Sequence, residues 1–183
     1  MLLVDASRLQ VGERLILQRE PTDLAGLAAR TVEAWRVAAP NHRIELELDG
    51  GELIGSWDRS RLARVVDNLL ANAVRYSQPG TRVRVRLRRE PASAAGAEPQ
   101  AQAMAVVEVE DEGLGIPPAD LPHIFEWFRR GSNVEQIAGT GIGLAGAAEI
   151  VAQHGGTLSV QSEEGRGSTF TLQLPIEPPD ATV

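Results

Sequence analysis

Asn68 and Asn72 are the first residues in the chain whose type and spacing suit a defined chemistry. They lie one turn apart on a predicted helix, Arg75 falls in the same angular sector, and Tyr76 lies nearer its apolar stripe. Amide oxygens are hard ligands that suit Mg²⁺, which binds few protein ligands together with phosphate oxygens; a guanidinium nearby would neutralise the same phosphates. A solvated helix face with two ordinary asparagines explains this segment equally well when it is considered alone.

Asp111 ends a predicted strand and is followed by Gly113 and Gly115. A buried carboxylate can accept a hydrogen bond from the amino group of an adenine, and glycines allow the backbone to approach a flat base. The alternative is an ordinary Asp-x-Gly turn, which is common in loops. The segment is a candidate base-binding site.

A glycine-rich segment opens the last predicted helix, and it reads Gly139-Thr140-Gly141-Ile142-Gly143-Leu144. The free N–H groups and the positive dipole end of a helix N-terminus bind phosphate oxygens, and glycines leave these groups unobstructed. The segment follows a loop, so it is not the dinucleotide-binding fingerprint, in which a strand comes first. It is a candidate phosphate-binding site.

Three helices are predicted to carry these segments. The clearest spans 58–77, and its apolar stripe, which must face a sheet, consists of Leu62, Val65, Val66, Leu69, Leu70 and Ala73. An earlier helix begins near Thr22, which can serve as its N-cap, and ends before Pro40. The third follows the glycine-rich segment and ends at Gly155 and Gly156, which favour a left-handed stop.

Five segments alternate between apolar and polar residues, as half-buried strands do, and they span about 43–49, 83–88, 104–110, 157–162 and 168–174. Arginines of the second segment would lie opposite Glu108 and Glu110, which predicts a solvated sheet face. Residues 91–103 are predicted to form a flexible hairpin loop. The order of elements predicts an α+β fold, a two-layer α/β sandwich. It would have a mixed, mostly antiparallel sheet of about five strands and about three helices on one face.

Length, charge and composition exclude several classes of protein. The 183 residues suit one domain, and a net charge of −7 would repel a nucleic-acid backbone. With no cysteine and three scattered histidines, His42, His123 and His154, the chain offers no thiolate metal site. No apolar run approaches the ~20 residues needed to span a bilayer, so we expect a soluble domain without membrane contact of its own.

The order of these segments resembles that of the histidine kinase catalytic domains of the GHKL ATPase superfamily, which have the Bergerat fold. Residues 67–77 are similar to the N box of that family, and Asp111, Gly113 and Gly115 are similar to its first glycine box. Residues 124–130, 139–144 and 167–170 are similar to the phenylalanine box, the second glycine box and the last glycine box.

The resemblance implies that the chain binds ATP and Mg²⁺. Asn72 and Asn68 would hold the metal, Arg75 would approach phosphate, and these three would form the catalytic set. Tyr76 would lie against the nucleoside, and Asp111 would bind the adenine amino group. The implied nucleotide-binding residues also include Gly113, Gly115, Ile116, Phe128, Gly139, Thr140, Gly141, Ile142, Gly143, Leu144 and Thr169.

A flexible lid over the nucleotide is also implied, running from Ile116 to about Thr140, with the glycines that follow it as a hinge. Phe125 and Phe128 would pack the aromatic end of this lid onto the core, or serve simply as core residues. Both readings place these two rings against the apolar interior.

The residue at position 68 bears on whether the site favours ATP hydrolysis or phosphoryl transfer. The chaperone, mismatch-repair and gyrase ATPases of the superfamily have a glutamate there as a general base for water, whereas Asn68 cannot accept a proton at neutral pH. Phosphoryl transfer to a nucleophile supplied elsewhere needs chiefly positioning and charge neutralisation. The family's acceptor is a histidine followed by an acidic residue and, a few positions on, a proline; His42, His123 and His154 do not fit.

We therefore expect the catalytic fragment of a two-component sensor histidine kinase, an ATP:protein-histidine phosphotransferase. Residues 1–20 would be the tail of a dimerisation hairpin and its linker, 21–176 the catalytic ATP-binding domain, and 177–183 a disordered tail. Expected partners are ATP, the dimerisation and phosphoacceptor domain of the same kinase, and the receiver domain of a response regulator.

The expected location of the domain is the cytoplasm. The parent protein is expected to be a homodimer, anchored in the inner membrane or not, and the fragment is expected to be a monomer. Two alternatives remain. One is a nucleotide-dependent interaction module, such as a degenerate kinase, and the other is an anti-sigma-type serine kinase of the same fold.

Overall fold

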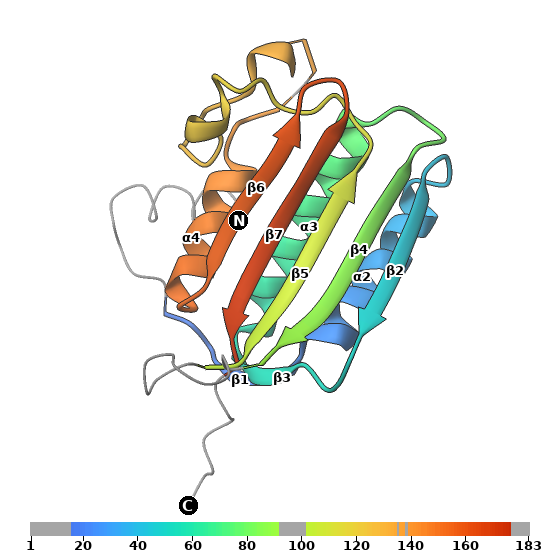
Figure 1. Cartoon of the computed structure of the whole chain (residues 1–183). Helices are drawn as coiled ribbons and strands as arrows, with labels where there is room; N and C mark the ends of the chain where they lie inside the picture. The colour runs from blue at the N-terminus through green and yellow to red at the C-terminus, as the bar shows by residue number, and fades with distance from the viewer. Residues whose placement is uncertain (1–15, 92–101, 135, 138, 177–183) are drawn as a thin grey trace, which may run out of the picture.

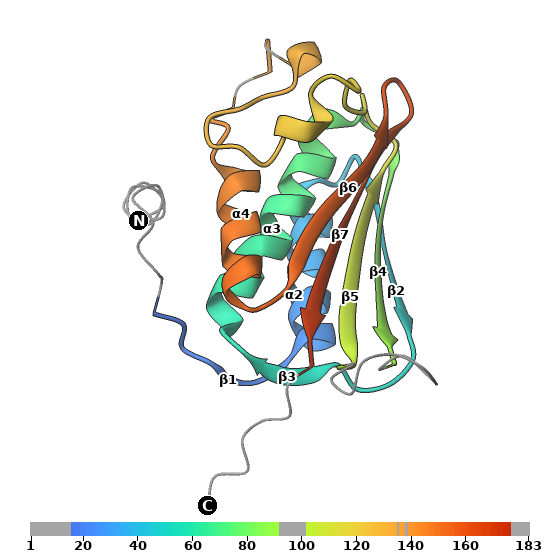
Figure 2. The same cartoon turned by 60° about the vertical axis from the view of Figure 1, so that its left-hand side comes forward.

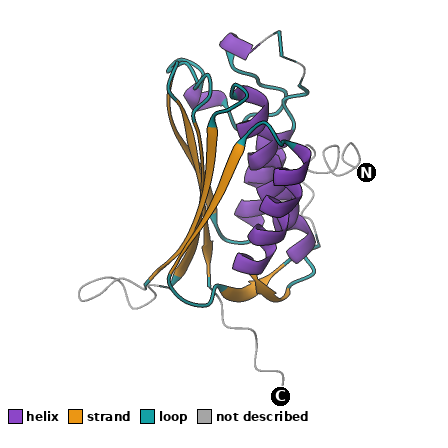
Figure 3. Cartoon of the chain, turned by 90° about the vertical axis from the view of Figure 1, so that its right-hand side faces the viewer, coloured by secondary structure: helices purple, strands orange, loops and turns teal. Residues whose placement is uncertain are grey.

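The computed structural model describes residues 16–91, 102–134, 136–137 and 139–176 (Figure 1). Helices cover one face of a five-stranded sheet whose order is β2-β4-β5-β7-β6. The elements are β1 (Glu20–Asp23), α2 (Leu24–Ala38), β2 (Arg43–Asp49), β3 (Ile54–Trp57), α3 (Arg59–Tyr76), β4 (Arg82–Glu90), β5 (Met104–Asp111), η1 (Leu121–His123), η2 (Ser132–Val134), α4 (Gly143–Gln153), β6 (Thr157–Glu163) and β7 (Gly167–Pro175). Figures 2 and 3 show the two layers from the side, which confirms the predicted α+β sandwich.

The core lies between the sheet and the helices because both present apolar stripes to the same space. Val83, Val85 and Leu87 alternate along β4 and are at most 1% exposed. They meet the predicted stripe of α3, in which Leu69 and Leu70 are fully buried. Only β2 and β4 run parallel, and the other neighbours in this sheet are antiparallel.

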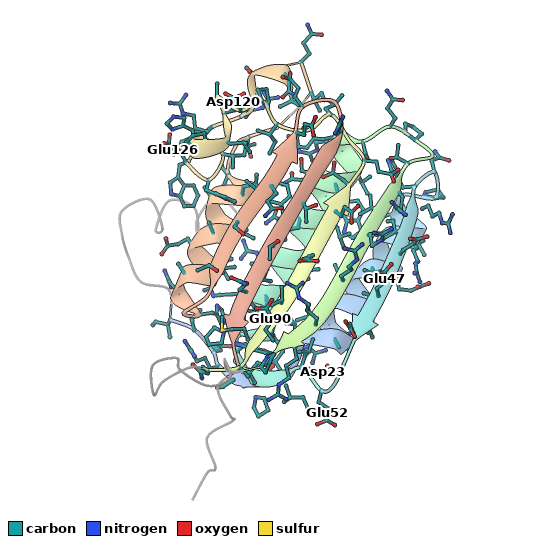
Figure 4. All side chains as sticks on the ribbon, in the orientation of Figure 1. Asp23, Glu47, Glu52, Glu90, Asp120 and Glu126 are labelled. Atoms are coloured by element: carbon teal, nitrogen blue, oxygen red, sulfur yellow. The ribbon has the colours of Figure 1, made fainter. Side chains whose placement is uncertain are left out.

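The outer face of the sheet carries a row of ion pairs. Arg84 Nη1 lies 3.2 Å from Glu110 Oε2, and Arg88 Nη1 lies 2.7 Å from Glu108 Oε1. Glu47 of β2 adds a contact of 3.2 Å to Arg84 Nε (Figure 4). The predicted solvated face is confirmed, and because these pairs border water each contributes only about 0–1 kcal/mol.

A small antiparallel sheet of β1 and β3 precedes α3, and the alternation pattern did not predict it. The prediction that Thr22 caps the first helix is wrong, since Thr22 lies in β1 and its hydroxyl donates to Trp57 O at 3.1 Å. Asp23 is the N-cap, and its carboxylate accepts the N–H of Gly26 at 3.0 Å. Both residue types cap helices, so pairing of Thr22 with β3 decides between them.

Asp58 and His154 join the ends of α3 and α4 that lie away from the lid. The Asp58 carboxylate accepts the N–H of Arg61 at 3.1 Å, and its own N–H donates to His154 Nε2 at 3.0 Å. His154 is fully buried and its Nδ1 donates to Ile150 O at 2.7 Å, so the ring is neutral with its proton on Nδ1. Burial lowers the pKa of His154.

Several expectations fall wholly or largely outside the described residues. These are the hairpin tail and linker at 1–20, of which 16–20 are described, the loop at 91–103, of which 92–101 are not, and the tail at 177–183. Among the helices of the described residues, none is both long and apolar enough to cross a membrane.

Replacing His154 by leucine is expected to lower the free energy of unfolding by roughly 1–3 kcal/mol, because the buried N–H of Asp58 loses its acceptor. A histidine pKa that is lower in the folded state than in the unfolded state gives stability that is present above the pKa of the unfolded state and is lost as pH falls. The destabilisation should therefore be larger at about pH 7.5 than at about pH 5.5. Urea unfolding of both chains at the two pH values measures this.

The exposed His123 provides the control, and His123→Gln should leave the unfolding free energy nearly unchanged at both pH values. A loss for His154→Leu that is equal at both pH values would contradict the neutral, buried histidine.

Candidate functional site

A cleft of about 540 Å³ opens at the end of the domain where α3, β5 and the start of α4 meet. The loop 116–134 lies at the end of the helix layer where α4 begins (Figure 1), and Figure 4 labels Asp120 and Glu126 on that loop. All the nucleotide-binding residues expected from the sequence line the cleft except Gly113, Phe128 and Thr169. Segments that are far apart in the sequence therefore form one site.

The polar side of the cleft belongs to α3. Asn68, Asn72 and Arg75 follow one another along the helix and line the cleft together. Both asparagines are half-buried, and the side chain of neither forms a hydrogen bond with another described residue. Their amide groups are therefore available to a ligand or a metal ion.

The N-terminus of α4 faces these amides. A Cβ atom placed on Gly143 would lie 3.1 Å from Asn68 Oδ1, so the two helices approach closely at this point. The N-cap of α4, Ile142, provides no side-chain cap, which leaves the first N–H groups of the helix open to an anion. Amide oxygens and helix N–H groups thus border the same space.

Three polar side chains converge on Gly139 at the end of the loop. A Cβ atom there would lie 3.6 Å from Tyr76 Oη, 3.7 Å from Arg75 Nη1 and 3.6 Å from Arg130 Nε. Arg130 donates through Nη2 to the carbonyls of Val134 and Ile137, and its buried Nε has no partner among the described atoms. Two guanidinium groups make this part of the cleft strongly cationic.

Asp111 lies at the inner end of the cleft and is 7% exposed. Its Oδ1 accepts the N–H of Gly113 at 2.9 Å, and the backbone of Ser168 also donates to it. Burial raises the pKa of Asp111 to about 6, against the opposing effect of these hydrogen bonds. The carboxylate is ionised at neutral pH and available as an acceptor.

Two glycines after Asp111 shape the turn. A Cβ on Gly113 would lie 2.5 Å from Tyr76 O, so this residue allows the close approach of the turn to α3 and does not line the cleft. Gly115 has a φ of 63° and touches the backbone of Glu163. Gly113 therefore lies outside the lining of the cleft, and its contact with a ligand stays a prediction.

The two phenylalanines of the aromatic segment behave differently. Phe125 packs edge-on against Phe170, with ring centroids 6.5 Å apart. Phe128 is 57% exposed, so its predicted packing on the core is wrong. Its φ is 64°, and its N–H donates to Gly141 O at 2.9 Å, which turns its side chain away from the interior. Trp127 lines the cleft instead.

Thr169 does not line the cleft because side chains alternate along β7. Its neighbours Ser168 and Phe170 face the helices and line the cleft, and Thr169 pairs in register with Glu110. The sequence pattern could have separated these positions, since Phe170 is the obvious inward residue.

The cleft also contains residues that the sequence did not single out. Arg64 and Arg61 could have been found from their position one and two turns before Asn68 on the same helix face. Seven of the others lie inside the N box, the phenylalanine box or the last glycine box, although no role in binding was expected of them: Ala71, Ile124, Trp127, Arg129, Arg130, Ser168 and Phe170. The remaining five lie outside the motifs, on the loop or on α4. The unexpected lining residues are Arg61, Arg64, Ala71, Ile124, Trp127, Arg129, Arg130, Gly131, Asn133, Val134, Gly146, Ile150, Ser168 and Phe170.

Comparison with known proteins identifies the family. Residues 57–178 match the family described as "Histidine kinase-, DNA gyrase B-, and HSP90-like ATPase". The chain belongs to this family. It is 36% identical to the sensor-like histidine kinase SenX3 of Mycobacterium tuberculosis over 176 residues, which is 94% of this chain and 40% of SenX3. TcrY, a probable sensor histidine kinase of the same organism, is 37% identical over 163 residues, 88% of this chain and 32% of TcrY.

Solved structures agree. The mycobacterial sensor histidine kinase MprB superposes with a TM-score of 0.74 at 31% identity, covering 87% of this chain and 99% of that one. Full-length ShkA, solved with AMPPNP, has the same fold, with a TM-score of 0.77 at 24% identity over 96% of this chain and 35% of ShkA. The chain is a histidine kinase ATPase domain and spans about 40% of the SenX3 relatives.

Replacing Asp111 by asparagine tests the buried carboxylate of this ATPase domain. Because the pKa of Asp111 is raised in the folded state, its contribution to stability is present below the unfolded-state pKa of 3.8. This contribution is lost as pH rises through the folded-state pKa of about 6. Relative to Asp111→Asn, the parent domain should lose roughly 2–3 kcal/mol of unfolding free energy between about pH 4 and pH 7. Denaturant unfolding of both chains across this range gives the difference, and a difference that is constant with pH would contradict the buried, ionised state.

Proposed function

We propose that this domain binds Mg-ATP in the cleft and donates the γ-phosphoryl group to a histidine carried by a dimerisation helix. The observation that supports it best is the meeting of the Asn68 and Asn72 amides with the open N-terminus of α4. One surface offers oxygen ligands for a metal, and the other offers N–H donors for phosphate oxygens.

The donor set fits Mg²⁺ bound jointly by protein and phosphates. Among the described residues, no group of three or more His, Cys, Asp or Glu could hold a metal ion by itself. Mg²⁺ usually takes one or two protein ligands, several waters and phosphate oxygens, and Asn72 with Asn68 can supply the protein share. The metal would neutralise phosphate charge, while Arg75 and Arg130 would hold the phosphates from the other side of the cleft.

The nucleoside would lie toward the sheet. Ionised Asp111 can accept a hydrogen bond from the adenine amino group, and Tyr76 lines the same cleft. A guanine presents a carbonyl where adenine presents the amino group, so this acceptor would favour ATP over GTP.

Phosphoryl transfer to an external nucleophile fits the site better than hydrolysis. Asn68 occupies the position at which a general base would activate water, and an amide does not take up a proton at neutral pH. None of the three histidines of the chain lines the cleft. His154 is buried and has both ring nitrogens in hydrogen bonds, so it cannot act as the acceptor.

The acceptor histidine would come from the dimerisation domain of the same kinase, and the phosphoryl group would pass on to an aspartate in a response regulator. SenX3, TcrY and MprB are named as sensor histidine kinases, which supports this assignment for a cytoplasmic domain. A degenerate kinase that only changes its lid on nucleotide binding, and an anti-sigma-type serine kinase, remain the alternatives to be tested.

Replacing Asn72 by alanine should weaken Mg-ATP binding about tenfold or more, because one metal ligand is lost. The fold should change little, since Asn72 is half-buried and lies outside the hydrophobic core. Calorimetric titration with Mg-ATP measures the affinity. Gln161→Ala, on exposed β6, is the matched control and should bind as the parent chain does. Equal affinity of Asn72→Ala and the control would contradict the metal site.

Joining the chain to a dimerisation hairpin and adding Mg-ATP should produce acid-labile phosphate on a histidine of the hairpin. Acid stability distinguishes the alternatives, because phosphohistidine is lost in acid and phosphoserine is retained. Radiolabelled transfer followed by acid treatment is the measurement. Acid-stable phosphate would favour the serine kinase, and nucleotide binding without any transfer would favour the interaction module.

A further inference from the structure

A second concavity lies between α2 and α3, on the helix layer and outside the nucleotide cleft. This α2–α3 groove has a volume of about 460 Å³. Its apolar lining comes from Leu27, Ala34 and Ala63, with the side chain of Thr31 beside them. Its basic lining consists of Arg30, Arg59 and Arg64. The groove therefore combines small apolar side chains with guanidinium groups.

The charge of the groove is opposite to that of the molecule. Arg30 and Arg59 are exposed, and no ion pair joins either of them to another described residue. Asp67 is the one acidic residue that lines the groove, and it accepts the indole N–H of Trp35 at 2.8 Å. Arg30 and Arg59 less Asp67 give a formal charge of +1, without counting Arg64, on a chain whose net charge is −7.

The groove adjoins the far end of the nucleotide cleft. That cleft continues past Asn68 along α3 to Arg64 and Arg61, which lie about one and two helical turns further. Arg64 lines both the cleft and the α2–α3 groove. A segment bound in the groove would therefore lie beside the cleft on the side of Asn68 that is remote from Asp111.

We propose that the α2–α3 groove binds an acidic amphipathic helix of the protein that presents the phosphoryl acceptor. This inference rests on the proposed function, which requires such a protein to approach the cleft. Carboxylates on one side of the helix would pair with Arg30 and Arg59, and small apolar side chains would contact Ala34 and Ala63. A nucleic acid offers no apolar side chains to this lining and is repelled by the overall negative charge.

A fluorescein-labelled helical peptide with glutamates along one face and alanines and leucines along the other is the probe. Fluorescence anisotropy should show that it binds the full chain at low ionic strength. Arg30→Glu combined with Arg59→Glu should weaken binding about tenfold or more, and the corresponding glutamine double variant should weaken it less. Arg43→Glu is the control, since Arg43 is 78% exposed on β2, does not line the groove and should leave binding nearly unchanged.

Failure to bind the acidic peptide, equal loss with Arg43→Glu, or tighter binding of a short DNA duplex than of the peptide would overturn the inference. Calorimetric titration of the same variants with Mg-ATP separates the two proposals. Normal Mg-ATP binding without peptide binding would overturn the groove assignment alone. Peptide binding that depends on Arg30 and Arg59 in a chain that does not bind Mg-ATP would overturn the proposed function and leave the groove as a peptide site.

Discussion

The close approach of Gly143 to Asn68 is the contact on which the site depends. It places the open end of α4 beside the polar face of α3, and a Cβ atom at Gly143 would crowd Asn68 Oδ1 at 3.1 Å. Both helices pack on one face of the same sheet, as Figure 2 shows. At the opposite end, Asp58 and His154 hydrogen-bond the two helices to each other, so the frame is fixed where no ligand binds.

This arrangement separates the tasks of the site. The helices and the end of β5 are fixed parts of the fold. They can position phosphates, a metal ion and a nucleobase without rearrangement. The loop above the cleft contributes cations, of which Arg130 is held by carbonyls of its own loop. The amide at position 68 favours positioning over activation of water, as the proposed phosphotransfer would require.

Periodicity predicted the main elements because each is long and buries one face. The apolar stripe of α3 and many of the alternating apolar residues of the five strands are buried in the structure. The four-residue strands β1 and β3 are too short for a pattern, so the choice between Thr22 and Asp23 as N-cap depended on tertiary pairing. Within the site, the motifs predicted the α3, Asp111 and α4 contributions. They did not predict Arg130, which a loop carries, or the outward turn of Phe128, which a hydrogen bond to Gly141 determines.

Paramagnetic relaxation by Mn²⁺ bound with ATP tests the central claim most directly, since Mn²⁺ substitutes for Mg²⁺ and broadens nuclear resonances within a limited radius. The account predicts strong broadening of the side-chain amides of Asn68 and Asn72 and of the backbone amide of Gly143. The amide of Ser159, on the exposed β6, should be little affected. Broadening centred elsewhere, or equal at all these positions, would contradict a metal–triphosphate site between α3 and α4.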